Sequence, residues 1–193
     1  MSLTLLLGGV RSGKSARALQ LARAFERDAS GAQVLFVATA QAFDDEMTQR
    51  IVTHRDERNF RWQTLEEPLD LAQKVASHLD SHTETSVVVI DCMTLWVSNL
   101  LLNSADESHT ELAISTRVRE LISVIEDYPT ATTSRGAIER HWIVVSNEVG
   151  LGIVPPTPLG RAYRDALGRG NQLLAAAATA VTLMVAGIEM RIK

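Results

Sequence analysis

The sequence has 193 residues, of which 46% are hydrophobic and 22% are charged, and its formal net charge at pH 7 is −4. These values are typical of a globular protein with a sizeable core, and the lack of a basic excess argues against nucleic acid as the main partner. The one cysteine, Cys92, excludes an intramolecular disulfide framework, fits a reducing compartment and is expected to be a packing residue.

The hydropathy pattern predicts no membrane span. No segment has the roughly 20 consecutive apolar residues that a membrane-spanning helix needs. The N-terminus also lacks the basic start and long apolar block of a signal peptide. We therefore expect a cytoplasmic protein.

The first predicted strand, Leu3 to Leu7, is followed by a glycine-rich segment and then by apolar residues at helical spacing from Lys14 onward. That segment is Gly8, Gly9, Val10, Arg11, Ser12, Gly13, Lys14 and Ser15. A glycine, four residues and then Gly-Lys-Ser is the P-loop pattern, in which backbone N–H groups and a helix N-terminus bind phosphates. Lys14 is expected to reach the β- and γ-phosphates, and the Ser15 hydroxyl to bind Mg²⁺. The alternative, a glycine-rich turn that matches by chance, is disfavoured by the flanking strand and helix.

A second charge-free strand is predicted over Gln33 to Ala38. A strand, a helix and another charge-free strand predict a parallel pair joined by a right-handed crossover. Thr39 and Ala40 then lie at the carboxyl end of the second strand, where ligands bind in open α/β sheets.

The next predicted helix begins at Asp44 and carries a cluster of charge. Its polar residues here are Arg50, His54, Arg55, Asp56, Glu57 and Arg58. Residues four apart share a helix face, and like charges at that spacing repel unless an anion faces them. The helix therefore faces a polyphosphate that a neutral His54 could attack, or it is a solvated outer face on which Asp56 and Glu57 offset the arginines.

Four β-branched residues followed by an aspartate, Ser86 to Asp91, predict a central strand with a carboxylate at its carboxyl end. Such an aspartate can be a turn or cap residue. Downstream of a P-loop it is expected to meet Mg²⁺ directly or through water.

The other elements follow in chain order. We expect strands over Trp62 to Leu65, His141 to Ser146, Ala180 to Ala186 and Ile188 to Lys193. Helices are expected from Pro68, over Met93 to Leu102, over Glu111 to Ile125, and after a cap at Thr157, with Leu159 on the buried side of this last helix. A surface loop is expected over Thr130 to Gly136. Regulatory GTPases carry Asn-Lys-x-Asp near position 147 to recognise guanine. Glu148 and Gly150 stand there instead, which argues against a GTPase switch.

Taken together, these motifs resemble the bifunctional adenosylcobinamide kinase/adenosylcobinamide-phosphate guanylyltransferase family of cobalamin biosynthesis. Beyond the P-loop, the resemblance lies in Ala38-Thr39, Asp44 to Met47, Arg50 to His54, Trp62 to Glu66 and Asn147 to Pro155. It runs nearly from end to end of the chain.

The resemblance implies two reactions: adenosylcobinamide is phosphorylated with ATP or GTP, and GMP is then transferred from GTP to its phosphate. His54 matches the histidine that carries GMP covalently. The matching nucleotide contacts are the P-loop, Ala38, Thr39, Ala40, Arg55, Asp56, Glu57, Arg58 and Glu66. The implied fold is α/β, a RecA-like P-loop NTPase with a mostly parallel sheet and helices on both faces. Residues 1–193 would form a single nucleotide-binding domain, and relatives assemble as homotrimers.

Some features depart from the family pattern. Thr53 stands where some relatives have a second histidine, Asp91 where the residue can be glutamate, and residues 130–140 look like an insertion. Two alternatives stay open: a small-molecule kinase in which His54 only contacts phosphate, and a nucleotide-dependent switch protein.

Overall fold

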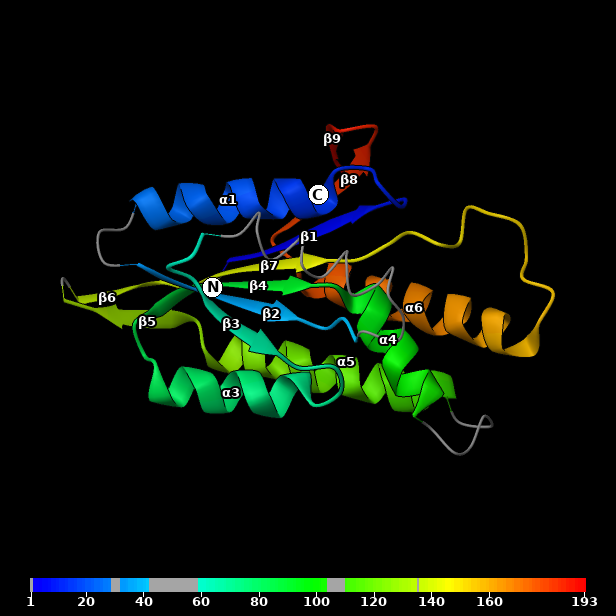
Figure 1. Cartoon of the computed structure of the whole chain (residues 1–193), viewed down its shortest axis with the longest axis horizontal. Helices are drawn as coiled ribbons and strands as arrows, with labels where there is room; N and C mark the ends of the chain where they lie inside the picture. The colour runs from blue at the N-terminus through cyan, green and yellow to red at the C-terminus, as the bar shows by residue number, and fades with distance from the viewer. Residues whose placement is uncertain (1, 29–31, 42–58, 104–109, 135) are drawn as a thin grey trace.

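The computed structural model describes residues 2–28, 32–41, 59–103, 110–134 and 136–193. A seven-stranded sheet in the order β3-β2-β4-β7-β1-β8-β9 lies between helices on both of its faces (Figure 1). Its strands are β1 (Ser2–Gly8), β2 (Gln33–Ala38), β3 (Gln63–Glu66), β4 (Thr85–Asp91), β7 (His141–Val145), β8 (Ala180–Val185) and β9 (Ile188–Arg191). All neighbours pair in parallel except β8 and β9, so the predicted α/β class and mostly parallel sheet are confirmed.

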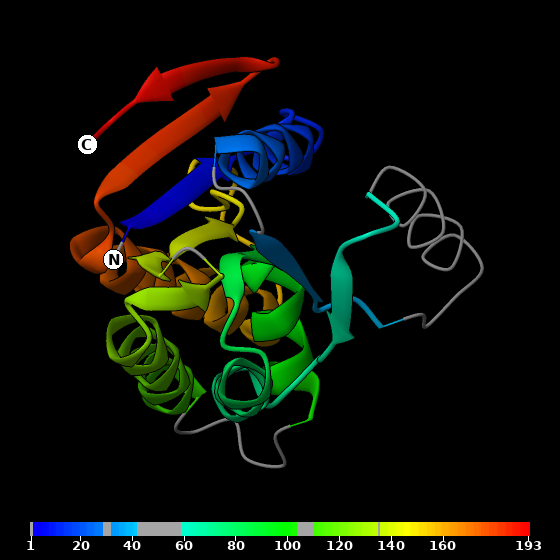
Figure 2. The same ribbon diagram turned by 90° about the vertical axis from the view of Figure 1, so that its left-hand side faces the viewer.

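Two apolar cores form because alternate residues of each strand point to opposite faces of the sheet. The described helices are α1 (Lys14–Asp28), α3 (Leu71–Ser81), α4 (Met93–Leu102), α5 (Thr110–Asp127) and α6 (Pro158–Ala177). Helix α1 packs Ala18, Leu19 and Ala22 on one face, and the other four helices pack on the opposite face (Figure 2). No helix among the described residues combines the length and apolar composition that crossing a membrane requires.

The expectation that the first two strands pair directly with each other is wrong. β1 and β2 are parallel, but β4 and β7 lie between them. Both inserted strands are apolar on both faces, so they occupy the centre of the sheet, where neither face meets water. The crossover through α1 therefore spans three strand positions instead of one.

The surface loop expected over Thr130 to Gly136 is also wrong. The structure has an antiparallel hairpin there, β5 (Thr130–Thr133) with β6 (Gly136–Glu139). The threonines are β-branched and suit a strand despite their polarity. The backbone N–H of Thr132 donates to Thr83 O at 2.9 Å, which ties the hairpin to the segment before β4.

A buried arginine completes this connection. Arg140 is 2% exposed, and its guanidinium donates to Thr85 O at 2.7 Å, Tyr128 O at 3.1 Å and Thr83 O at 3.4 Å. The buried guanidinium is thereby satisfied by three main-chain carbonyls. The residues that looked like an insertion are thus joined to the sheet by a fixed set of hydrogen bonds.

Two smaller expectations about helices also fail. Helix α3 begins at Leu71 and not at Pro68, because the carbonyls of Pro68 and Leu69 accept hydrogen bonds from side chains of α4. Leu159, expected on the buried side of α6, is 42% exposed. The N-cap of α6 is as predicted, since the Thr157 hydroxyl accepts a hydrogen bond from Gly160 N.

A partly buried histidine, His141, makes the fold sensitive to acid. His141 stacks on Phe25 with ring centroids 3.8 Å apart, and burial lowers its pKa, against a smaller opposing effect of Glu139. The unfolded chain binds a proton near pH 6.5 and the folded chain only at lower pH, so stability decreases as the pH falls below about 6.5. We expect His141→Phe to reduce this decrease, by at most about 1.4 kcal/mol per pH unit. Urea unfolding of both proteins at pH 7.5 and pH 5.5 measures how much free energy of unfolding each one loses on acidification. An equal loss in the wild type and the variant would contradict the prediction.

Candidate functional site

The predicted site residues meet at the carboxyl edge of the sheet. In the strand register, Ala38 of β2 lies opposite Glu66 of β3 on one side and opposite Asp91 of β4 on the other. Asp91 in turn lies opposite Val145 of β7, which neighbours β1. Parallel strands therefore bring together side chains from three distant segments of the sequence, next to the strand that leads into the glycine-rich loop.

The loop between β1 and α1 has the backbone conformation that its glycines predict. Gly8 has φ = +149°, Arg11 +55° and Gly13 +96°, and helix α1 begins directly after Gly13. Gly9, Val10 and Arg11 are exposed, whereas Ser12 and Lys14 are each 7% exposed. The loop thus presents exposed backbone and a helix N-terminus on its outer side, a geometry suited to an anion.

The loop rests on a turn from the other end of the chain. The N–H of Gly187, between β8 and β9, donates to Ser12 O at 3.0 Å. Gly187 has φ = +82°, and a Cβ built on Gly13 would lie 3.3 Å from the Gly187 Cα. The backbones of the two segments therefore approach each other closely.

The ammonium of Lys14 points into the loop. Its Nζ donates to Gly9 O at 2.6 Å and to Ser12 Oγ at 3.4 Å. Burial lowers the pKa of Lys14, while the electrostatic interactions with Cys92 and with Asp91 act in the opposite direction. A phosphate would be a stronger acceptor for this ammonium than the Gly9 carbonyl, because charge-assisted hydrogen bonds are roughly twice as strong as neutral ones.

The oxygen donors beside Lys14 suit Mg²⁺. Ser15 lies in the first turn of α1, and Asp91 closes β4. One hydroxyl, one carboxylate and the oxygens of a bound phosphate form the kind of donor set that Mg²⁺ accepts. Within the described part of the chain there is no cluster of three or more His, Cys, Asp or Glu side chains that could hold a metal by itself.

Cys92, next to Asp91, is unsuited to nucleophilic chemistry. Its side chain packs against the core beneath α1. Burial raises the pKa of the thiol to about 11, and the Asp91 carboxylate adds to the increase. The thiol is therefore protonated near neutral pH, as expected of a packing residue.

Thr39 and Asn99 connect the ends of β2 and β4. Thr39 is 0% exposed; its Oγ1 donates to Cys92 O at 2.7 Å and accepts from Cys92 N at 2.9 Å. Asn99 of α4 donates from Nδ2 to Thr39 O at 2.8 Å and to Pro68 O at 3.3 Å. The sequence alone does not predict these bonds, because a lone amide in an apolar helix does not reveal which carbonyl it meets.

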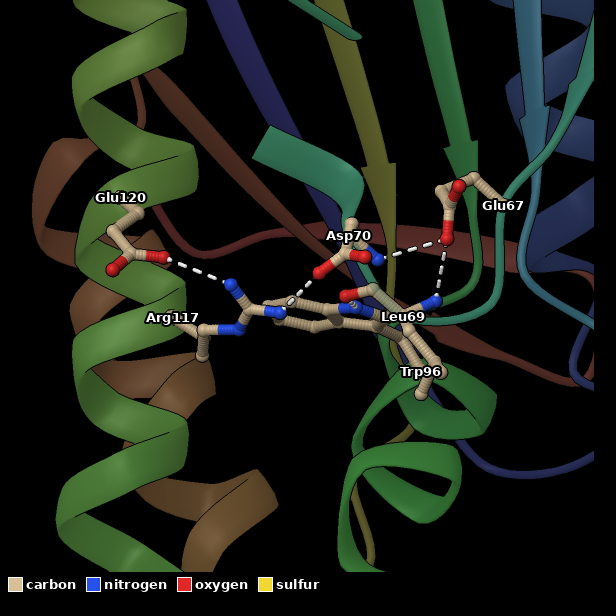
Figure 3. A network of polar contacts seen from close by, with 6 residues as sticks. All are labelled: Glu67, Leu69, Asp70, Trp96, Arg117 and Glu120. Carbon is tan, nitrogen blue, oxygen red and sulfur yellow. Dashed lines mark hydrogen bonds and ion pairs between the residues drawn. The ribbon is translucent and has the colours of Figure 1, made fainter. Parts of the chain in front are cut away.

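The loop after β3 is held by side chains of α4 and α5 and by Glu67 of the loop itself (Figure 3). Glu67 Oε1 accepts from the N–H groups of Leu69 and Asp70, both at 2.8 Å, and Trp96 Nε1 donates to Leu69 O at 2.9 Å. Arg117 of α5 donates to Asp70 Oδ1 at 2.5 Å, which raises the pKa of Arg117. These bonds fix the chain that immediately follows Glu66.

The segment after β7 lies beside the glycine-rich loop. Glu148 N donates to Gly8 O at 3.2 Å, and Asn147 N donates to Thr94 Oγ1 at 2.9 Å. Asn171 of α6 accepts from Ser146 Oγ at 2.6 Å and donates to Asn147 O at 3.0 Å. Sequence reasoning missed Asn171, for which the one available signal was an amide on the buried stripe of a helix.

The residues predicted on the helix from Asp44 cannot be placed. The helix expected from Asp44, with His54, Arg55, Asp56, Glu57 and Arg58, lies outside the described residues. Ala40 is described and partly buried at the carboxyl end of β2. The structure therefore brings together the glycine-rich loop, Ala38 to Ala40, Glu66 and Asp91, and the contribution of His54 stays a prediction.

Gly8 offers a direct test of the loop conformation. A Cβ at this position would lie 2.4 Å from Met184 O and 2.7 Å from Ser12 Oγ, at a φ that L-residues rarely adopt. We expect Gly8→Ala to lower the free energy of unfolding by about 2 kcal/mol. Gly9→Ala is the matched control, because a Cβ at Gly9 has no atom within 4 Å. If urea unfolding gave equal stabilities for the two variants, the described conformation of the loop would be wrong.

Comparison with solved structures shows the fold. The flagellar accessory protein FlaH from Methanocaldococcus jannaschii matches with a TM-score of 0.55 and 15% sequence identity, over 100% of this chain and 78% of that chain. At this identity the likeness concerns the fold alone. It is consistent with a RecA-like P-loop core.

Comparison of sequences shows the family. The "Bifunctional adenosylcobalamin biosynthesis protein CobU" of Escherichia coli is 38% identical over 98% of both chains, as is the protein of that name from Salmonella typhimurium. The "Bifunctional adenosylcobalamin biosynthesis protein CobP" of Pseudomonas aeruginosa is 40% identical over 98% of this chain and 96% of its own length. The profile of one family matches residues 4–192. The chain therefore belongs to the cobinamide kinase / cobinamide phosphate guanyltransferase family.

Proposed function

We propose that this protein phosphorylates adenosylcobinamide with ATP or GTP and then transfers GMP from GTP to the new phosphate, giving adenosylcobinamide-GDP and pyrophosphate. The observation that carries this proposal is the glycine-rich loop with Lys14 beside Asp91, in a chain that matches the family over residues 4–192. A kinase and a guanylyltransferase both need a triphosphate held in this way.

In the kinase step, the loop N–H groups and the α1 N-terminus bind the phosphates of the nucleotide. Lys14 exchanges the Gly9 carbonyl for the β- and γ-phosphates and offsets the charge that develops during transfer. Ser15 and Asp91 would hold Mg²⁺, which supplies charge neutralisation at the phosphate oxygens. Ala38, Ala40 and Glu66 lie at the adjacent edge of the sheet, and we assign nucleotide contacts to these residues.

In the transfer step, neutral His54 attacks the α-phosphorus of GTP. An N–P bond forms, the bond to the β-phosphate oxygen breaks, and pyrophosphate leaves. An oxygen of adenosylcobinamide phosphate then attacks the same phosphorus and releases the histidine. An unperturbed histidine has a pKa of about 6.5, so the neutral imidazole is available near pH 7, and Arg55 and Arg58 are assigned to the charge on the phosphates.

The covalent step is tested by trapping. The protein is incubated with Mg²⁺ and GTP labelled at the α-phosphorus, then denatured and washed. We expect retained label that is labile in acid and stable in alkali, and no retained label from a parallel sample with γ-labelled GTP. Absence of α-label would overturn the guanylyltransferase part, and a separate assay of adenosylcobinamide phosphorylation then decides whether the kinase part stands.

The proposal includes a homotrimer in the cytoplasm. Self-association is supported by exposed apolar side chains on the edge strand β9, where Ile188 is 69% and Met190 53% exposed. A cytoplasmic location is supported by the ATP and GTP that the reactions consume. Size-exclusion chromatography with light scattering measures the number of copies, and a monomeric mass would contradict the trimer.

A further inference from the structure

Thr39 was predicted as a nucleotide contact, yet its polar groups are already engaged within the protein. Its hydroxyl both donates to and accepts from the backbone of Cys92. Its N–H donates to Asp91 O at 3.3 Å, and its carbonyl accepts from Asn99 Nδ2. With 0% exposure, the side chain has no surface to offer a ligand.

These bonds all lead to the end of β4. Thr39 makes hydrogen bonds to the carbonyl of Asp91 and to both the N–H and the carbonyl of Cys92. The same Asp91 acts on Lys14 electrostatically. The position of the Asp91 carboxylate relative to the Lys14 ammonium therefore depends on how the residue after β4 is held.

Asn99 holds Thr39 in place from the opposite side. It is 5% exposed, and its amide donates to carbonyls that follow β2 and β3, those of Thr39 and Pro68. Helix α4 begins at Met93, directly after Cys92, so Asn99 lies on the helix that β4 leads into. The ends of β2, β3 and β4 are thus joined through one threonine and one asparagine.

We propose that Thr39 and Asn99 are positioning residues that fix the Asp91 carboxylate for the Mg²⁺-bound nucleotide, and that the side chain of Thr39 does not contact the nucleotide itself. This inference rests on the proposed function, in which Asp91 holds Mg²⁺. Residues that orient a metal ligand typically change metal affinity by 10- to 100-fold when they are replaced.

The test compares Thr39→Val with Thr39→Ser. Valine keeps the shape of threonine and removes both hydroxyl bonds to Cys92, whereas serine keeps the hydroxyl. GTP binding is measured by titration calorimetry with Mg²⁺ and, separately, with EDTA. We expect Thr39→Val to weaken binding in Mg²⁺ about tenfold, to change binding in EDTA less than about twofold, and Thr39→Ser to restore wild-type affinity.

Asn99→Leu provides a second variant in case Thr39→Val does not fold. It keeps a similar volume and removes the donor to Thr39 and Pro68, so it is expected to weaken binding in Mg²⁺ selectively as well. An equal loss in Mg²⁺ and in EDTA, or wild-type affinity in both variants, would overturn the inference. If wild-type protein itself bound GTP equally with and without Mg²⁺, the metal site of the proposed function would fail and this inference with it.

Discussion

Replacement of Lys14 by alanine is expected to reduce both the kinase and the guanylyltransferase rates by about 10³-fold. The ammonium is buried inside the glycine-rich loop, 2.6 Å from Gly9 O, and acts electrostatically with Asp91. A cation in this position would stabilise the phosphates of either reaction, because the proposed function assigns both reactions to this one loop. Steady-state assays of each reaction with wild-type and variant protein measure the two losses.

The control for this variant is Lys74→Ala, on an exposed position of α3. It should leave both rates unchanged. We also expect Lys14→Ala to fold normally, because it removes a charge whose burial already lowers its pKa. Loss of the kinase rate with an intact transferase rate would mean that the two reactions bind their nucleotides at different places.

Replacement of His54 by alanine is expected to separate the two activities. Guanylyl transfer should fall by about 10³-fold or more, because the covalent carrier is removed. Phosphorylation of adenosylcobinamide should stay within a few-fold of wild type, since it needs the loop, Lys14 and Asp91. The two rates and the label retained from α-labelled GTP are measured in the same preparations.

His82→Ala serves as the matched control. His82 follows α3 near the start of β4, at the opposite end of the strands from Asp91. It should retain both activities and the covalent label. A His54→Ala protein that still retained α-label would place the carrier elsewhere, and one that lost both activities equally would favour a phosphate contact over a nucleophile.

Local patterns predicted the parts of the site that depend on neighbouring residues. The run from Gly8 to Ser15 contains the turn, the helix start and the buried lysine within eight residues. The bounds of β2 and α4 follow in the same way from mostly apolar segments without charged residues. Such features are set by the conformational preferences of a few consecutive residues, so the sequence suffices for them.

Long-range features escaped prediction because several arrangements satisfy the same pattern. The apolar runs of β4 and β7 suit the centre of a sheet, but nothing local says that they separate β1 from β2. The threonines before residue 134 are compatible with either a loop or a strand. The hydrogen bond from Thr132 N to the carbonyl of Thr83, which is distant in sequence, favours the strand. At Thr39 the sequence pattern predicted a contact that the structure does not support. Its position at the sheet edge suggested a ligand contact, but its hydroxyl is hydrogen-bonded to the backbone of Cys92.

The turn at Gly187 limits where the chain can be altered. Tips of hairpins on a surface usually accept insertions, because their backbone groups bond to water. Here the N–H of Gly187 bonds to Ser12 O, and its Cα stands 3.3 Å from the place where Gly13 would carry a side chain. An inserted peptide or reporter between β8 and β9 would thus distort the glycine-rich loop some 170 residues earlier in the chain. The exposed Ser134, directly after β5, is the better site for an insertion.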